Sequence, residues 1–297
     1  MTPAVTRTTA TLIGFSAVAL WALLALFTVA TAPVPPFQLN AMSFSIGGAV
    51  GLVWLAATGG FGQLARVSWR VYLFGTLGLF GYHAFYFTAL RLAPPAEAGL
   101  IAYLWPLLIV LFSGLLPGEH LRAGHVAGAL VSLAGAALIL GGGIGGGGAG
   151  AVAGYGFAIA CALTWSGYSV LSRRLGATPT ASVAVFCLAT AALSGVAHLA
   201  FEETVAPAGA LGWAAVVGLG LGPVGLAFYT WDVGVKRGDI QLLGTASYAA
   251  PLLSTFALIL AGMTEARSTL LLAAALITLG ATLAARAGRA GRKNRPE

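Results

Sequence analysis

One ionisable side chain, that of His83, lies deep inside a long apolar stretch of the sequence. Ionisable groups are costly inside a membrane and usually functional there, so His83 is a candidate to bind a carboxylate or carbonyl group or to exchange a proton. The structural alternative is a neutral histidine bonded to a carbonyl of a neighbouring helix. No aspartate or glutamate is predicted at a similar depth, which argues against a site for cationic drugs and against coupling through a buried carboxylate.

Aromatic side chains occur in the same apolar stretches. Tyr82 and Tyr86 lie within about 100° of His83 on one helix, and Trp165 shares a helix face with Tyr168. Because Trp and Tyr normally gather at membrane interfaces, deep ones either pack in the core or line a cavity, and we expect lining. Apolar walls with few polar groups suit a neutral or zwitterionic small molecule. The candidate substrate-binding residues are Trp21, Tyr82, His83, Tyr86, Tyr103, Trp105, Trp165, Tyr168 and Tyr248.

The remaining polar groups in or near the helices have structural explanations. Cys161 and Cys187 are expected to act as small apolar side chains, so the sequence predicts neither a disulfide nor a metal site, and no cofactor. Three pairs near helix ends are expected to be ordinary contacts: Asp232 with Lys236, His198 with Glu202, and Glu119 with Arg122.

The composition of the 297-residue chain requires a membrane. Hydrophobic residues make up 59% of it and charged residues 8%, whereas a water-soluble domain carries roughly a quarter charged residues. Ten apolar windows are long enough to cross a hydrocarbon core of about 30 Å. They are residues 9–30, 37–58, 69–90, 94–116, 123–143, 151–172, 180–201, 210–234, 239–262 and 267–286. We therefore expect an all-α integral membrane protein with ten transmembrane helices.

Positive charge is distributed unequally between the two sides of the predicted membrane. If the N-terminus is cytoplasmic, 13 of the 15 Lys and Arg residues lie on the cytoplasmic side, and only Arg91 and Arg267 lie outside. This bias places both termini in the cytoplasm of a bacterial inner membrane, with the basic tail at anionic lipid headgroups rather than nucleic acid. The first window exceeds the usual ~7–15-residue signal core, and Pro33 would follow the cleavage site, so we expect an uncleaved helix.

The sequence contains two similar halves. Tyr103-x-x-Pro106 recurs 145 residues later as Tyr248-x-x-Pro251. Because each half holds five helices, the second half crosses the membrane in the opposite sense, and inverted repeats with matched helix interruptions are typical of alternating-access transporters. Pro106 and Pro251 are expected to bend helices four and nine at the substrate site. The predicted units are a first repeat (1–143), a glycine-rich linker (144–150), a second repeat (151–286) and a basic tail (287–297).

Short motifs in both halves resemble those of one superfamily. The first half carries Phe85-Tyr86-Phe87-Thr88-Ala89-Leu90-Arg91, Tyr103-x-x-Pro106 and Gly118-Glu119; the second carries Tyr229-Thr230-Trp231, Lys236-Arg237 and Tyr248-x-x-Pro251. The pattern resembles the drug/metabolite transporter superfamily with paired EamA-type domains. Trp21, His83, Tyr103-Leu104-Trp105-Pro106 and Trp165 make the chain similar, within it, to the YddG-type exporters of aromatic and other neutral amino acids. The resemblance implies ten helices and a pathway lined by helices one, three, four, six, eight and nine.

Together these features predict a monomeric carrier that exports neutral amino acids, including aromatic ones, by alternating access. We expect facilitative transport or coupling through His83 alone. The nearest alternative is the same fold carrying another metabolite, such as a nucleobase, a purine or a drug. A receptor or assembly protein is disfavoured because the loops are very short. An enzyme is disfavoured because His125, the histidine of a possible intramembrane protease, has no Gly-x-Ser-Gly nucleophile to act with.

Overall fold

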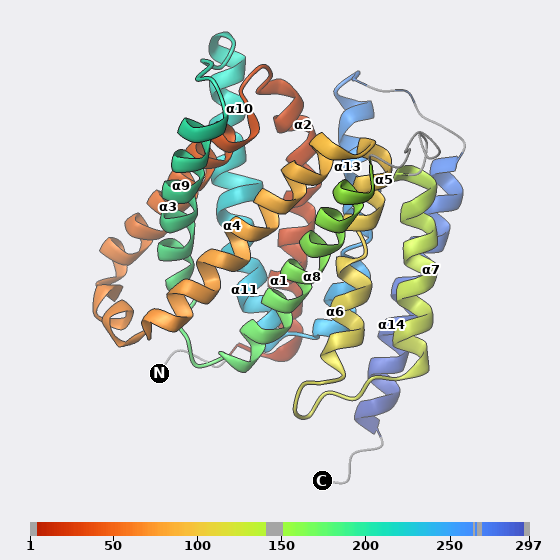
Figure 1. Cartoon of the computed structure of the whole chain (residues 1–297). Coiled ribbons are helices and arrows are strands. Elements are labelled where there is room, and N and C mark those ends of the chain that lie inside the picture. The colour runs from red at the N-terminus through yellow and green to blue at the C-terminus, as the bar shows by residue number, and fades with distance from the viewer. Residues whose placement is uncertain (1–4, 141–150, 264, 266–268, 294–297) are drawn as a thin grey trace.

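The protein is a bundle of helices (Figure 1). The computed structural model describes residues 5–140, 151–263, 265 and 269–293, and every regular element within these residues is helical. The all-α fold predicted from the sequence is therefore confirmed. The predicted linker, residues 144–150, and residues 294–297 of the predicted tail lie outside the described residues.

The elements follow one another along the chain without any strand among the described residues. They are α1 (Arg7–Trp21), α2 (Leu24–Ala30), α3 (Pro36–Thr58), the 3₁₀ helix η1 (Gly60–Arg66), α4 (Trp69–Leu92), α5 (Pro95–Ala102), α6 (Trp105–Ser113), α7 (Ala123–Leu140), α8 (Val152–Arg174), α9 (Ser182–Phe201), α10 (Gly209–Leu221), the π-helical turn η3 (Gly222–Leu226), α11 (Ala227–Arg237), α12 (Ile240–Ala246), α13 (Ala249–Leu260) and α14 (Thr269–Lys293).

Each predicted window coincides with one helix or with two consecutive ones. Among the described residues, seven stretches are long and apolar enough to cross a membrane, and two further apolar helices are shorter. Four windows are interrupted: between α1 and α2, between α5 and α6, at η3, and between α12 and α13. The last helix, α14, runs on to Lys293, so the start of the predicted tail continues that helix.

Local sequence explains where several helices begin. The side chains of Thr6, Ser68 and Asp239 accept backbone N–H groups in the first turns of α1, α4 and α12. Such caps satisfy donors that have no acceptor within the helix. Pro36 and Pro95 open α3 and α5, because a proline in the first turn forfeits only an N–H that would be unpaired there.

The two repeated prolines lie in the first turn of a helix. Pro106 is in the first turn of α6 and Pro251 in that of α13, directly after breaks at Tyr103–Leu104 and Ser247–Tyr248. The expected bends thus take the form of breaks between two short helices. Pro223 lies in the π-helical turn η3.

A further break, between α1 and α2, falls at Ala22–Leu23. The sequence does not predict it, because neither proline nor glycine occurs at that point. The α1–α2 break, the α5–α6 break and η3 bring helix ends into the interior of the bundle, where they line the site described below.

The interface between α7 and α14 repeats itself symmetrically. A Cβ atom added to Gly128 would lie 2.5 Å from the Gly280 carbonyl oxygen, and one added to Gly135 would lie 2.9 Å from the Ala273 carbonyl oxygen. The two contacts are equivalent under the repeat, because Ala273 lies 145 residues after Gly128 and Gly135 lies 145 residues before Gly280. Helices can approach this closely only where side chains are small.

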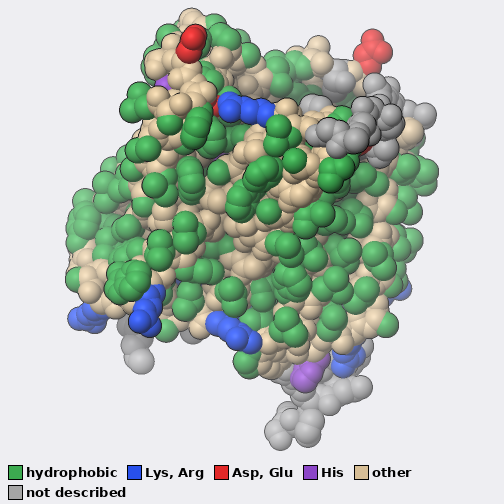
Figure 2. Space-filling view, viewed as in Figure 1, with side chains coloured by type: hydrophobic (Ala, Val, Ile, Leu, Met, Phe, Trp, Pro, Cys, Tyr) green, Lys and Arg blue, Asp and Glu red, His purple; other side chains and the backbone are tan. Residues whose placement is uncertain are grey.

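Charged side chains mark the ends of the bundle. The start of α1 and the end of α14 lie at the same end (Figure 1), which we name the termini face; the opposite end is the distal face. In the view of Figure 2 the Lys and Arg side chains gather mostly along the termini face, whereas hydrophobic side chains cover the middle. This surface fits a molecule whose belt faces lipid.

Candidate functional site

Seven of the nine predicted binding residues surround one cavity. The cavity has a volume of about 120 Å³ and lies where α1, α4, α5, α6, α8 and η3 meet. Of the predicted residues, Tyr168 and Tyr248 do not line it. The lining residues that the sequence did not predict are Leu24, Ala102, Pro223, Val224 and Phe228. Among the described lining residues, none is an aspartate, glutamate, lysine or arginine.

His83 is the most polar side chain of the cavity wall. Its Nδ1 lies 2.8 Å from the carbonyl oxygen of Leu79, one turn earlier on α4. A carbonyl can only accept, so Nδ1 carries the proton and Nε2 of the neutral ring is an acceptor. The partner is therefore a carbonyl of its own helix and not of a neighbouring one. The ring packs edge-on against Phe44, with centroids 5.1 Å apart.

Two tyrosines of α4 form one wall of the cavity. The rings of Tyr82 and Tyr86 are stacked, 6.1 Å apart and 2° from parallel. Tyr82 also contacts Trp165 of α8 at 5.4 Å. Since α4 begins near the termini face (Figure 1), Tyr86 lies one turn nearer the distal face than Tyr82. The wall therefore extends from the middle of the bundle toward the distal face.

Tryptophans from both halves of the chain meet at the other side of the cavity. Trp21, the last residue of α1, donates its indole N–H to the Pro223 carbonyl at 3.1 Å, which joins the α1 break to η3. The Trp21 ring lies 6.1 Å from Trp105 and 5.7 Å from Trp165. Pairs in such edge-to-face arrangements are attractive beyond their burial, so this cluster is a rigid part of the site.

Trp231 of α11 belongs to the same cluster, although the sequence did not predict it as a site residue. Its ring centroid is 5.0 Å from that of Trp21 and 5.9 Å from that of Trp105. Its indole N–H donates to the Ser169 hydroxyl, and the residue is buried. The signal available in the sequence is an aromatic side chain deep in an apolar window, the same signal that points to Trp165.

Tyr168 and Tyr248 are packed in the core instead of lining the cavity. Tyr168 stacks on Trp165 and Phe74 and lies over the backbone of Gly78. It lies one turn nearer the termini face than Trp165, which places it behind the cavity wall. Tyr248 is fully buried and bonds to a backbone N–H of α6. Helix nine of the predicted pathway, which corresponds to α12 and α13, therefore contributes no lining residue to this cavity.

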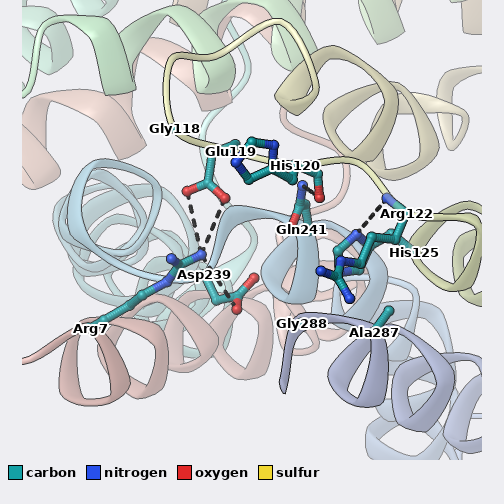
Figure 3. A pocket seen from close by; sticks show the side chains of 10 residues that line it. All are labelled: Arg7, Gly118, Glu119, His120, Arg122, His125, Asp239, Gln241, Ala287 and Gly288. Carbon is teal, nitrogen blue, oxygen red and sulfur yellow. Dashed lines mark hydrogen bonds and ion pairs between the residues drawn. The ribbon is translucent and has the colours of Figure 1, made fainter. Parts of the chain in front are cut away.

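An ion-pair network lies at the termini face (Figure 3). Glu119, in the segment between α6 and α7, pairs with Arg7 of α1 and with Arg173 of α8. Arg7 also reaches Asp239 at 3.5 Å. The expected partner of Glu119 is Arg122, but Glu119 bonds arginines of both halves instead, while the Arg122 N–H donates to His125. A small polar cavity of about 50 Å³ adjoins this network.

A second buried carboxylate organises the distal face. Glu202 accepts the backbone N–H groups of Phe37 and Gln38 at the start of α3. It also pairs with Arg91 at 2.8 Å and with His198 at 3.2 Å, as the spacing of His198 and Glu202 predicts. An anion at a helix N-terminus is favoured by the helix dipole, so this cluster has a structural role.

The predicted pair of Asp232 and Lys236 is present on α11. Lys236 Nζ lies 2.8 Å from the Asp232 carboxylate, and the Thr180 hydroxyl donates to that carboxylate at 2.7 Å. Both side chains are buried and mutually satisfied, so they leave no free charge for the cavity. In the part of the chain that the structure describes, no cluster of His, Cys, Asp and Glu has the composition of a metal site.

Comparison with known proteins identifies the family. The sequence model of the EamA-like transporter family matches residues 8–141 and again residues 152–286. The chain belongs to the EamA-like transporter family. The two matches fall one in each half, and the prediction of an EamA-type transporter is confirmed. Because members of the family are transporters, the prediction that the chain is not an enzyme is confirmed as well.

Named relatives of this EamA-family chain point in the same direction. It is 57% identical over 280 residues to the aromatic amino acid exporter YddG of Ancylobacter novellus, covering 94% of this chain and 97% of that protein. It is 27% identical over 264 residues to the aromatic amino acid exporter YddG of Escherichia coli, covering 84% and 87%. A crystal structure with 57% sequence identity superposes with a TM-score of 0.91 and covers 96% of this chain and all of that one.

Proposed function

We propose that this chain exports neutral amino acids, including aromatic ones, across a bacterial inner membrane. The observation that carries the proposal is the cavity: aromatic rings and one histidine line it, and its described lining residues include no formally charged side chain. A site of this kind suits a molecule with an apolar body and no net charge. The relatives named as aromatic amino acid exporters support the same class of substrate.

The cavity walls offer partners for the ammonium group and for the side chain of such a molecule. Nε2 of His83 accepts a hydrogen bond from the substrate ammonium group, and the indole faces of Trp21 and Trp105 attract the same cation. The stacked pair of Tyr82 and Tyr86 gives an aromatic or aliphatic side chain a flat apolar surface. A site whose described walls carry no carboxylate also rejects purely cationic drugs, because nothing in these walls balances their charge.

Transport proceeds by alternating access between two inverted five-helix repeats, which together supply ten membrane spans. Three features support this. The family model matches each half. The α7–α14 contacts are equivalent under a shift of 145 residues. The Ser132 hydroxyl donates to the carbonyl of Ile277, which lies 145 residues later and so at the equivalent position. A contact between equivalent positions is expected at the axis that relates two repeats. Since one chain supplies both repeats, a monomer is sufficient.

The ion-pair network supports a particular state of the transport cycle. Arg7 and Glu119 belong to the first repeat, and Arg173 and Asp239 to the second, so the Arg7–Asp239 and Glu119–Arg173 pairs hold the repeats together at the termini face. The positive charge of that face favours a cytoplasmic position, so this state is closed toward the cytoplasm. We propose that transport is facilitative, because the described cavity walls contain no carboxylate and the Nδ1–H of their one histidine already bonds the Leu79 carbonyl; the alternative is proton coupling through His83 alone.

Release of amino acids from cells tests this proposal. Cells that express the chain and are fed a phenylalanine-containing dipeptide should release more phenylalanine than cells with an empty vector. Trp105→Ala should lower that release about tenfold or more at equal amounts of membrane-inserted protein, because it removes a large aromatic contact surface. Trp213→Ala is the matched control, since Trp213 is half exposed on α10 and does not line the cavity.

Release no faster than with the empty vector would contradict the amino acid assignment, and an equal loss in Trp213→Ala would contradict the assignment of the cavity. Release of a nucleobase, purine or drug without release of phenylalanine would favour the same fold acting on another metabolite.

A further inference from the structure

Tyr103 and Tyr248 occupy equivalent positions in the two repeats but have different surroundings. Each lies at the break between the two short helices of its repeat. Tyr103 is half-buried and lines the cavity. Tyr248 is fully buried, and its phenolic oxygen accepts the backbone N–H of Leu107 at 3.1 Å. A tyrosine of the second repeat therefore caps a broken helix of the first.

The capped group explains why this bond matters. Leu107 follows Pro106 in the first turn of α6, and N–H groups in the first turn of a helix lack an acceptor in the preceding turn. A backbone N–H without a partner is costly at membrane depth. Tyr248 supplies the acceptor from outside the helix, so its hydroxyl stabilises the arrangement of α6 and α13 seen in this structure.

The second repeat has the same Tyr-x-x-Pro-Leu motif without the same cap. Leu252, 145 residues after Leu107, follows Pro251 near the start of α13. Within the described part of the chain, no side chain accepts the Leu252 N–H, and the hydroxyl of Tyr103 makes no hydrogen bond. The Tyr103 hydroxyl and the Leu252 N–H are the counterparts of the Tyr248 hydroxyl and the Leu107 N–H. Both are present, but they do not bond to each other in this state.

The slot that receives Tyr248 is lined by residues that recur in the second repeat. Tyr248 packs in a cluster with Ala129 and Ala136 of α7, and both alanines are fully buried. Their equivalents on α14, 145 residues later, are Ala274 and Ala281. These two are alanines as well, yet they are only half-buried. The second repeat thus keeps alanines at the positions equivalent to the Tyr248 slot, and the described cluster that Ala274 joins, with Leu252, Leu270 and Ile277, contains no tyrosine in this structure.

We propose that the two tyrosines exchange roles when the transporter changes state. Inverted repeats relate the two end states by the internal symmetry. In the state open to the cytoplasm, Tyr103 enters the slot formed by Ala274 and Ala281 and accepts the Leu252 N–H. Tyr248 leaves its own slot and lines the cytoplasmic cavity, where it contacts the substrate.

The exchange rests on the proposed alternating-access function and adds a specific consequence to it. Each phenolic hydroxyl stabilises one of the two states, so removing it shifts the population toward the other state. The two hydroxyls must therefore act in opposite directions, although they belong to the same residue type at equivalent positions.

Cysteine labelling measures this population directly. Leu24→Cys, introduced after Cys161→Ala and Cys187→Ala, reports the state, because Leu24 lines the cavity and begins the helix that leads to the distal face. Whole cells are treated with a membrane-impermeant maleimide. Tyr248→Phe should lower the ratio of outward-open to inward-open protein about fivefold, the change expected from one hydrogen bond, and so slow labelling, whereas Tyr103→Phe should raise that ratio and so speed labelling. Both variants keep the ring, so packing is matched.

A substitution at a residue other than the two tyrosines provides a second test of the exchange. Ala281→Leu fills the slot on α14, so it should block the exchange: labelling of Leu24→Cys stays at least as fast as in the parent, while transport is lost. Ala275→Leu is the matched control, because Ala275 lies on the same helix with an exposed side chain. It makes the same chemical change outside the slot and should transport at the parent rate.

The outcomes separate this inference from the proposed function, because labelling requires no substrate. Opposite effects of the two tyrosine variants support the exchange even if phenylalanine is not the cargo. The exchange is overturned if both variants shift labelling in the same direction, if Tyr248→Phe leaves it unchanged, or if Ala281→Leu transports as well as Ala275→Leu.

Discussion

In the proposed mode of substrate binding, polar recognition in the cavity depends on His83. Its Nδ1–H is used by the Leu79 carbonyl, and this fixes both the orientation of the ring and the acceptor role of Nε2. A neutral acceptor among aromatic rings can bind an ammonium group without introducing a charge that would have to be balanced.

Substitutions of His83 distinguish an acceptor from a proton carrier. His83→Gln, which keeps a neutral acceptor and donor, should retain most of the transport activity. His83→Leu should reduce transport about tenfold, as expected when a charged group loses a hydrogen bond. The measurement is the rate of phenylalanine transport with equal amounts of folded protein. Equal and complete loss in both variants would indicate instead that His83 must take up a proton.

The residue types of the site were predictable from the sequence, but not all of their surroundings. Deep aromatic residues on α4 and α8 follow from helical spacing, which alone places Tyr82 beside Tyr86. Tyr168 could not be separated from Trp165, because both lie on one helix face and only the neighbouring helices decide which of them reaches the cavity. The position of Trp231 in the cluster could not be predicted for the same reason.

Close backbone contact, more than long side chains, holds the elements of the fold together at the α7–α14 interface. Gly128 lies against the Gly280 carbonyl there, and Gly135 against that of Ala273. In lipid there is little hydrophobic drive between helices, so van der Waals contact and small residues provide the association. This interface contains positions that are equivalent under the 145-residue repeat, and in the proposed cycle one repeat turns against the other there.

Added methyl groups test this interface. Gly128→Ala should lower the thermal midpoint in detergent, because its Cβ would lie 2.5 Å from the Gly280 carbonyl oxygen and overpacking typically costs about 1–3 kcal/mol. Gly195→Ala in α9, where a Cβ meets no atom within 4 Å, should leave the midpoint unchanged or raise it through better helix propensity. Equal midpoints for the two variants would show that the close contact does not contribute to stability.

The helix boundaries were predictable where hydrophobicity and proline agree. The breaks before Pro106 and Pro251 follow from the missing N–H of proline. The break at Ala22–Leu23 could not be predicted, because it depends on tertiary contacts such as the bond from Trp21 to the carbonyl in η3. Helix α14 extends past the predicted end of its span, since a change from apolar to basic residues marks the membrane edge and not the end of a helix.

The whole molecule combines a cavity whose described walls lack formal charges with charged networks at its two faces. The Arg7–Asp239 and Arg173–Glu119 pairs join the two halves at the termini face, and Glu202 joins α3, α4 and α9 at the distal face. Partly buried pairs of this kind set which surfaces meet, more than they add net stability. In the proposed alternating-access cycle, opening toward the cytoplasm requires the first network to separate, while the second can remain intact.

Uptake of labelled phenylalanine into liposomes that contain the purified chain tests facilitative amino acid transport through the aromatic cavity most directly. The parent protein should bring the internal concentration to equality with the external one, at the same final level with and without a pH gradient, and Trp105→Ala should slow this while Trp213→Ala does not. Absence of uptake by folded parent protein, or accumulation above the external concentration when a pH gradient is applied, would contradict it.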